Sequence, residues 1–141
     1  SVATCHLESF LDAGKIRAQQ LDLFFQKLTD RKHVIFSGDF NFGDGEVPET
    51  KHLPREYVDA WKATSKNAKG FTWNIEKSAM ARAGSFPGEK SRRLDRILIR
   101  SSSFVPVSAA IVGNRPVKKY SKLFPSDHFG ILADVRITKE K

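Results

Sequence analysis

The first third of the chain carries two different spacings of apolar residues. Residues 1–9 and 33–41 each contain a run of strand-forming side chains and end in polar ones. Between them, residues 16–28 repeat apolar side chains at steps of three and four, which is typical of a helix with one buried face. The apolar positions of this helix are Leu21, Phe24, Phe25 and Leu28. The pattern predicts a strand, a helix that covers a sheet, and a second strand in that order.

Short apolar segments follow, separated by turn-rich connections. Residues 41–55 contain two glycines and two prolines, which break any regular pattern and favour a surface position. We expect a packed helical turn at 57–61, a short strand at 71–74, and further strands at 94–100, 104–112, interrupted at Pro106, and 131–137. Since strands outnumber helices and a helix connects the first two strands, the chain predicts a layered α/β or α+β architecture.

The composition adds a strongly basic balance to this picture. The 141 residues contain 24 Lys and Arg against 16 Asp and Glu, a formal net charge of +8. A surplus of this size favours a polyanionic partner such as nucleic acid. We expect neither a membrane span nor a signal peptide, because no segment has the required pattern. The single cysteine, Cys5, lies in an apolar run, so we expect a buried thiol and a reducing, intracellular compartment.

A long connection at residues 75–93 concentrates part of the positive charge. Uncommonly long connections in small domains are functional or disordered. Basic residues here suit a phosphate-rich ligand, and a solvated, mobile face explains the same charge equally well. The basic residues are Lys77, Arg82, Lys90, Arg92 and Arg93.

Candidate chemistry begins where residues 33–41 pass from strand to turn, at Ser37-Gly38-Asp39-Phe40-Asn41. Side chains two apart in a strand share a face, so Asp39 and Asn41 point into one space if the strand continues through Asn41, with Phe40 packed behind them. A carboxylate can accept a proton or orient water, and a carboxamide can both donate and accept a hydrogen bond. An ordinary Asx-rich turn also explains this stretch on its own.

Asp95, Asp127 and His128 supply groups that this stretch lacks. Adjacent residues on an extended chain face opposite ways, so Asp127 is poorly placed to orient the ring of His128. A carboxylate on a separate strand can accept a hydrogen bond from one ring nitrogen and stabilise the imidazolium. We assign that orienting role to Asp95. His6 follows the first strand, and a lone histidine there is more typical of a structural residue.

Taken together, five segments resemble the endonuclease/exonuclease/phosphatase superfamily, and the resemblance covers nearly the whole chain. The superfamily includes abasic-site endonucleases, pancreatic-type deoxyribonucleases and inositol polyphosphate 5-phosphatases. The chain looks most like the 5′-tyrosyl-DNA phosphodiesterases, where the His-Leu-Glu-Ser, Thr-Trp and Phe-Pro-Ser-Asp-His motifs occur together. The five segments are Cys5-His6-Leu7-Glu8-Ser9, Ser37-Gly38-Asp39-Phe40-Asn41, Phe71-Thr72-Trp73, Arg93-Leu94-Asp95-Arg96 and Phe124-Pro125-Ser126-Asp127-His128-Phe129-Gly130.

The resemblance implies a DNase I-like two-sheet α/β sandwich and hydrolysis of phosphate esters that depends on Mg²⁺, with Mn²⁺ as a substitute. By position, Asp39 would orient or deprotonate the attacking water, and Asn41 would hold a phosphate oxygen. His128, backed by Asp95, would stabilise the charged pentacoordinate phosphorus. Such groups act because they stabilise the transition state more than the ground state.

The resemblance also assigns roles around this centre. His6 and Ser9 would contact the phosphate, and Asp127 would be a metal ligand. Trp73 would line the groove for the DNA strand, and a core or edge aromatic explains that residue equally well.

Two departures from the family bear on the site. The family takes its principal metal-binding glutamate and a further asparagine from the first half of the domain, and no residue before His6 supplies them. Glu8 matches the histidine motif instead. Residue 43 is a glycine where the tyrosyl-DNA phosphodiesterases usually carry an arginine, although Asp44 matches. We therefore expect residues 1–141 to be the C-terminal half of one domain, inactive alone and completed by the N-terminal half from the same protein or another chain.

The predicted function is a Mg²⁺-dependent phosphodiesterase acting on DNA ends, with 5′-tyrosyl adducts as the candidate substrate and a nuclear location if it serves DNA repair. The alternatives among enzymes are an abasic-site endonuclease and a phosphatase of small inositol-type molecules. The alternative outside enzymes is a basic nucleic-acid-binding module, whose DNA binding would weaken steeply with salt and ignore Mg²⁺. An acid, an amide and a supported histidine together favour an enzyme, since a binding module does not need them.

Overall fold

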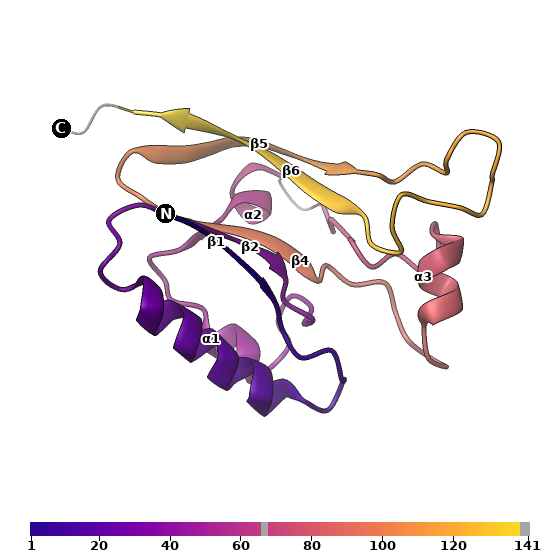
Figure 1. The fold of residues 1–141 in the computed structure, drawn as a ribbon, viewed down its shortest axis with the longest axis horizontal. Coiled ribbons are helices and arrows are strands. Elements are labelled where there is room, and N and C mark those ends of the chain that lie inside the picture. Colours follow the sequence, from indigo (N-terminus) through magenta and orange to yellow (C-terminus); the bar gives the residue numbers. More distant parts are fainter. Residues whose placement is uncertain (66–67, 139–141) are drawn as a thin grey trace.

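The computed structural model describes residues 1–65 and 68–138, and within them strands form two sheets (Figure 1). The larger sheet has the strand order β1-β2-β4-β3, and β5 pairs with β6 in the smaller one. The strands are β1 (Val2–His6), β2 (Val34–Asp39), β3 (Val58–Asp59), β4 (Asp95–Arg100), β5 (Phe104–Val112) and β6 (Gly130–Ile137). The helices are α1 (Gly14–Leu28), α2 (Ala60–Thr64) and α3 (Ala79–Gly84), with a 3₁₀ turn, η1 (Glu49–His52). The expected mixed α/β architecture is confirmed.

The predicted strand, helix and strand at the start of the chain are β1, α1 and β2. β1 and β2 run parallel, and α1 covers one face of their sheet (Figure 1). Its apolar face packs on the sheet, so Leu21 and Phe36 are fully buried and the rings of Phe25 and Phe36 meet edge to face at 5.6 Å. The thiol of Cys5 joins this core, as expected.

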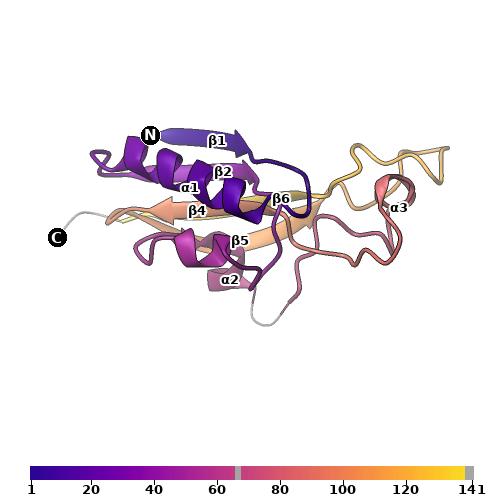
Figure 2. The same cartoon turned by 90° about the horizontal axis from the view of Figure 1, so that it is seen from below.

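β5 and β6 lie on the opposite side of the larger sheet from α1 (Figures 1 and 2). Their antiparallel register runs from Phe104 opposite Ile137 to Val112 opposite Gly130. It shifts between Pro106 and Ser108, where proline has no N–H to donate to the ladder. The expected interruption of this strand is therefore a bulge.

The connection at residues 75–93 is more ordered and more buried than its composition predicts. It contains α3, begun by the Ser78 side chain, which accepts the Ala81 N–H. The guanidinium of Arg93 at its end is almost fully buried and makes ion pairs with Asp44 and Asp59. Basic residues of this connection therefore serve partly as structural counter-charges, which the charge pattern alone did not distinguish from a phosphate-binding surface.

A correction also applies to residues 57–61. Instead of a single helical turn, Val58 and Asp59 form β3 at the sheet edge, and α2 begins at Ala60. The Asp59 side chain accepts the N–H groups of Trp61 and Lys62, which is a regular N-cap. No helix among the described residues is long and apolar enough to cross a membrane.

Candidate active site

Strand register brings three of the predicted site residues into one row. His6 lies opposite Asp39 across the parallel pair β1 and β2, and Asp39 lies opposite Asp95 across the antiparallel pair β2 and β4. Directly opposed residues on neighbouring strands point to the same face of a sheet. The imidazole of His6 lies 3.6 Å from the Asp39 carboxylate, measured from Nε2 to Oδ2. Three residues far apart in sequence therefore lie together at one end of the strands of the larger sheet.

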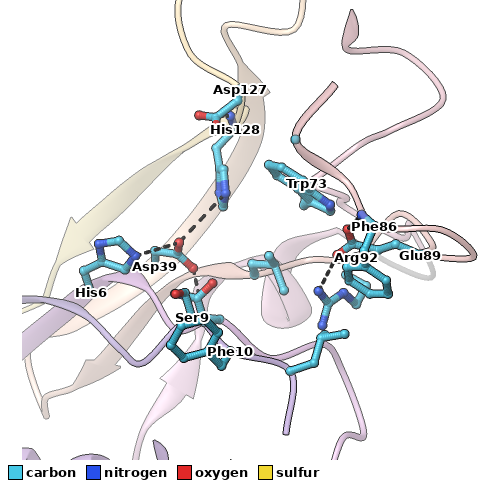
Figure 3. Close-up of a pocket in the computed structure, with 14 residues that line it drawn as sticks. His6, Ser9, Phe10, Asp39, Trp73, Phe86, Glu89, Arg92, Asp127 and His128 are labelled. Atoms are coloured by element: carbon cyan, nitrogen blue, oxygen red, sulfur yellow. Dashed lines mark hydrogen bonds and ion pairs between the residues drawn. The ribbon is translucent and has the colours of Figure 1, made fainter. Parts of the chain in front are cut away.

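His128 reaches this row from the segment that leads into β6. Its Nδ1 lies 2.7 Å from Oδ2 of Asp95, and its Nε2 lies 3.9 Å from Oδ2 of Asp39 (Figure 3 shows the second pair). The first distance is a hydrogen bond and the second is too long for one. One ring nitrogen is thus held by a carboxylate, and the other faces the remaining carboxylate across a gap.

Thr72 holds both partners of this pair in place. Its hydroxyl oxygen accepts the backbone N–H of Asp95 at 3.0 Å, and its carbonyl accepts the N–H of Phe129 at 2.8 Å. The side chain is fully buried. Thr72 lies in a motif that the sequence singled out, but its neighbour Trp73 drew the functional assignment. The sequence signal that could have identified Thr72 is its position between two aromatic residues, Phe71 and Trp73.

Asn41 reaches the site by a different route from the one expected. β2 ends at Asp39, and Asn41 adopts a left-handed backbone with φ of 53°. Its N–H donates to Oδ1 of Asp39 at 2.9 Å, and its Nδ2 donates to the carbonyl of Leu7 at 2.8 Å. The strand does not persist, so an Asx turn rather than the strand pleat brings Asp39 and Asn41 together, with Phe40 buried behind them as expected.

A buried ion pair anchors the loop that carries Ser9. Arg17 in α1 bonds to Glu49 at 2.8 Å, and both side chains are almost fully buried. The same guanidinium donates to the carbonyls of Glu8, Phe10 and Leu11. These contacts anchor the chain on both sides of Ser9, which lies at the wall of the site (Figure 3).

The row opens into a pocket of about 680 Å³. Figure 3 shows its polar end, with His6, Asp39 and His128 facing one another. Its other end is largely apolar and carries one arginine and one glutamate. The polar lining residues are His6, Ser9, Asp39, Asn41, Glu89, Arg92, Asp127 and His128, and the others are Phe10, Leu11, Trp73, Gly84, Phe86 and Leu94.

Trp73 and Asp127 occupy different parts of this pocket. Trp73 is 8% exposed, and its ring centroid lies 5.0 Å from that of His128. It is therefore a packed residue and a pocket wall at once. The Asp127 carboxylate is exposed, and its Oδ1 accepts the Ser126 hydroxyl and the His128 N–H. The structure places Asp127 at the rim of the pocket, outside the row formed by Asp39 and Asp95.

Comparison with known proteins gives one consistent result, although no family profile matches the chain. The chain is 37% identical over 143 residues to tyrosyl-DNA phosphodiesterase 2 of Xenopus laevis, an alignment that covers 95% of the chain. A crystal structure of the Danio rerio enzyme complexed with single strand DNA product matches 96% of the chain with a TM-score of 0.77 and 29% identity. Over nearly its whole length, the chain is a homologue of part of tyrosyl-DNA phosphodiesterase 2.

Homology to tyrosyl-DNA phosphodiesterase 2 extends over part of each relative. The chain spans 37% of the Xenopus laevis protein and 55% of the Danio rerio crystal chain. An endonuclease/exonuclease/phosphatase from Bacteroides vulgatus shares the fold alone, with a TM-score of 0.66 and 18% identity over 94% of this chain and 48% of its own. The described residues are thus part of the fold of tyrosyl-DNA phosphodiesterase 2.

Gly43, which we expect to differ from the tyrosyl-DNA phosphodiesterases, lies in a crowded space. A Cβ at Gly43 would lie 2.7 Å from Oε1 of Glu46 and 3.5 Å from the side chain of Arg92. Arg92 in turn pairs with Glu46 and Glu89. Two charged side chains from elsewhere therefore crowd the space beside Gly43.

Burial and neighbouring charges shift the pKa values of Asp39 and His128, which face each other. Burial raises the pKa of Asp39 above its usual value, and the negative charge of Asp95 raises it further, while the N–H of Asn41 acts in the opposite direction. Burial alone lowers the pKa of His128, but the hydrogen bond to Asp95 and the surrounding carboxylates outweigh it and raise the pKa overall. These shifts favour Asp39 as a proton acceptor and His128 as a positively charged imidazolium beside it. Burial and the charges of Asp39 and Asp95 raise the pKa of Cys5 to about 12, so its thiol stays protonated.

The donor atoms of Asp39, Asp95 and His128 lie within 4.8 Å of one another, close enough to share a metal ion. Magnesium prefers oxygen ligands, keeps several waters, and is often held by one or two carboxylates with substrate phosphates. Asp95 already accepts the hydrogen bond of His128, so Asp39 is the carboxylate of this group that fits such an ion. The site therefore suits magnesium held by few protein oxygens.

The raised pKa of His128 predicts a pH-dependent contribution to stability. A histidine with a raised pKa in the folded state stabilises fully below its unfolded pKa of about 6.5, and the contribution is lost as pH rises through the folded value. The free energy of unfolding of the native chain should therefore exceed that of His128→Gln by most at pH 5.5 to 6 and by progressively less above pH 6.5, as measured by urea titration.

The matched control for this experiment is His52→Gln. His52 pairs with Asp22 on the surface, with side chains 36% and 59% exposed, and such pairs contribute little. A difference for His128→Gln that grows with rising pH would contradict the assignment of the Asp95 hydrogen bond.

Proposed function

We propose that this chain carries part of the active site of a Mg²⁺-dependent phosphodiesterase that hydrolyses phosphate esters at DNA ends. Adducts between tyrosine and a 5′-phosphate are the leading substrate, and nuclear DNA repair is the setting that such adducts imply. The observation that carries the proposal is the placement of His128, held by Asp95, opposite Asp39 at one end of the pocket. Homology to tyrosyl-DNA phosphodiesterase 2 supports the choice of substrate.

In this proposal Asp39 accepts the proton of the water that attacks phosphorus. The P–O bond to the tyrosine oxygen breaks, that oxygen leaves with the bonding electron pair, and the DNA strand keeps a 5′-phosphate. The Nε2 of His128 faces Asp39 across 3.9 Å, a gap beside which a phosphate oxygen can approach both groups. An imidazolium there stabilises the negative charge that grows on the phosphoryl oxygens.

Neighbouring donors complete the phosphate contacts. The amide nitrogen of Asn41 has two N–H groups and gives one to Leu7, so the other remains for a phosphate oxygen. His6 and Ser9 lie on the same wall of the pocket and contribute further donors. These groups orient the phosphate without themselves exchanging protons with it.

Asp39 would hold the magnesium ion, with Asp127 at the pocket rim as a second, more distant oxygen donor. When bound, the ion supplies positive charge to the phosphoryl oxygens and lowers the pKa of a bound water. Mn²⁺ suits the same oxygen ligands.

DNA is the proposed partner because the pocket combines phosphate-directed groups with an aromatic wall. Trp73 and Phe86 line the side of the pocket away from Asp39, where a nucleotide next to the scissile phosphate would lie (Figure 3). Aromatic rings beside a cationic site are typical of single-strand binding surfaces. The net charge of +8 favours the same partner.

The site is proposed to be completed by the other half of the domain. The chain spans 37% of the curated relatives it matches. Within the described residues, neither outer edge of the β5 and β6 pair is bonded to another strand, and this pair exposes large apolar side chains. Unpaired edges and exposed apolar residues are features that neighbouring strands cover. The exposed residues are Val105, Val107, Val112, Leu132, Val135 and Ile137.

A chimera tests the proposed function directly. This chain replaces the matching segment of Xenopus laevis tyrosyl-DNA phosphodiesterase 2, and turnover of a 5′-phosphotyrosyl oligonucleotide with Mg²⁺ is measured. We expect Mg²⁺-dependent turnover by the chimera. Parallel assays use an abasic-site duplex and a soluble inositol polyphosphate, and preferential turnover of either would replace the tyrosyl substrate. A folded chimera that binds DNA without turnover would instead favour a non-catalytic module.

The 141 residues alone should be inactive on the same substrate, at least 10²-fold below the chimera, because one missing preorganised group already costs that much in typical enzymes. The control is the circular dichroism spectrum of the isolated chain, which should retain helix and strand. Turnover by the folded chain at the rate of the chimera would refute the need for the other half.

A further inference from the structure

The connection between β5 and β6 forms a second positively charged region, residues 114–123, which we call the basic arm. It extends beyond both sheets and lies beside α3, in the orange part of the ribbon (Figure 1). No acidic residue occurs from 113 to 126. The cations of the arm are Arg115, Lys118, Lys119 and Lys122. This density of like charge distinguishes the arm from the rest of the described surface.

The charges of the basic arm make no ion pair with the described residues, in contrast to Arg93 of residues 75–93. Arg115, Lys118, Lys119 and Lys122 are all exposed, and none makes an ion pair with any residue from 1–65 or 68–138. In the connection at 75–93, Arg93 pairs with two aspartates, and Arg82 donates to backbone carbonyls. Lys77 and Lys90 of that connection are exposed as well but stand 13 positions apart, whereas the arm gathers four exposed cations within eight residues.

Backbone hydrogen bonds give the basic arm a defined shape. The N–H of Val117 donates to the carbonyl of Leu123 at 2.6 Å, and the N–H of Tyr120 donates to Val117 at 2.9 Å. Lys119 adopts a left-handed backbone with φ of 80° at the tip. A closed loop of this kind presents its cations without first having to be ordered, which lowers the entropic cost of binding.

The basic arm is fixed directly to the pocket. Phe124, which follows it, is buried against Phe129 with ring centroids 5.8 Å apart, and its N–H lies 3.2 Å from the sulfur of Met80 in α3. The C-terminal end of α3, at Gly84, lines the pocket, and so does His128, four residues after Phe124. The arm thus stands beside the pocket rather than on a remote face.

We propose that the basic arm binds the phosphate backbone of a nucleic-acid strand beyond the pocket. Tyr120, 61% exposed among the lysines, stacks on an unpaired base. The four cations neutralise backbone phosphates and release their counterions, so the contact is independent of sequence and sensitive to salt. The identity of the polyanion rests on the proposed function, but the contact itself needs no hydrolysis.

The test is equilibrium binding of the full chain to a fluorescein-labelled single-stranded oligonucleotide, followed by anisotropy in EDTA from 50 to 200 mM KCl. The variant Lys118→Gln/Lys122→Gln removes two arm cations. Its slope of log affinity against log salt should be shallower by about 1.4, and its affinity near 100 mM salt weaker by on the order of tenfold. Tyr120→Ala should weaken binding to the single strand more than binding to a duplex.

The matched control is Lys27→Gln/Lys51→Gln, which removes the same net charge from exposed positions in α1 and η1. For this variant, the slope of log affinity against log salt should equal that of the native chain. Equal loss by both variants would reduce the effect to net charge and overturn the proposal. The proposal would also be overturned if Lys118→Gln/Lys122→Gln lost binding to phosphatidylserine vesicles but kept its oligonucleotide binding, because the arm would then contact anionic lipid instead. An inactive pocket leaves this binding test intact, so the two proposals fail separately.

Discussion

His128→Gln should lower kcat of the chimera on the 5′-phosphotyrosyl oligonucleotide by on the order of 10²- to 10³-fold, with little change in KM. Removing one preorganised donor to a developing oxyanion typically costs about 2.7 to 4 kcal/mol in the transition state. His128 fits that role because Asp95 fixes its Nδ1 at 2.7 Å and leaves Nε2 facing the pocket. A drop confined to kcat identifies a group that acts in the transition state rather than in substrate binding.

Asp95→Asn tests whether this effect belongs to His128 alone or to the pair. An amide cannot supply the negative charge that favours the imidazolium, so Asp95→Asn should lower kcat in the same direction as His128→Gln. The double variant should be little worse than His128→Gln, because the two residues act as one unit. Additive losses would show that Asp95 acts independently of the ring. His52→Gln, in the exposed pair with Asp22, is the matched control and should leave kcat unchanged.

The pH dependence of kcat for the chimera independently tests the roles assigned to Asp39 and His128. Activity requires Asp39 without its proton and His128 with one. Because the pKa of His128 is raised by the hydrogen bond to Asp95 and by the surrounding carboxylates, activity should fall on the alkaline side as the imidazolium is lost. In His128→Gln the alkaline limb should disappear from the residual activity.

The sequence predicted those parts of the molecule that depend on local pattern. The period of apolar residues in 16–28 identified α1, and strand-forming runs identified β1, β2 and β4 within a few residues. The position of Asp95 at the start of β4 was also sufficient to pair it with His128, because a strand end is a fixed place from which a side chain can reach the sheet edge.

The parts that the sequence did not predict depend on contacts between distant residues. Asn41 leaves the strand because its amide and N–H find partners on Leu7 and Asp39, and no local signal ranks that turn above an extended strand. The row of His6, Asp39 and Asp95 depends on strand register, which is set only when the sheet forms. Arg93 appeared to be a solvent-facing cation because its partner Asp44 is 49 residues away.

Arg93→Met should destabilise the fold by about 3 kcal/mol, the largest stability change that we expect from a single substitution outside the apolar core. The guanidinium is 1% exposed and bonds to both oxygens of Asp44 and to Asp59. Breaking a buried ion pair from one side typically costs about 3 to 5 kcal/mol because it leaves a charge without compensation. Asp44 is 40% exposed and is partly solvated, which favours the lower end of that range.

A double variant separates the lost charge from the lost packing. Asp59→Asn keeps an oxygen to accept the N–H groups of Trp61 and Lys62, so the N-cap of α2 remains. In the Arg93→Met background Asp59 keeps only the longer ion pair with Arg96, at 3.5 Å, so its charge contributes less there than in the native chain. Arg93→Met/Asp59→Asn should therefore be less destabilised than the sum of the two single variants. Free energies of unfolding from urea titration give the coupling. Strict additivity would mean that Arg93 stabilises the fold through the volume of its side chain, because an ion pair between Arg93 and Asp59 requires the two substitutions to interact.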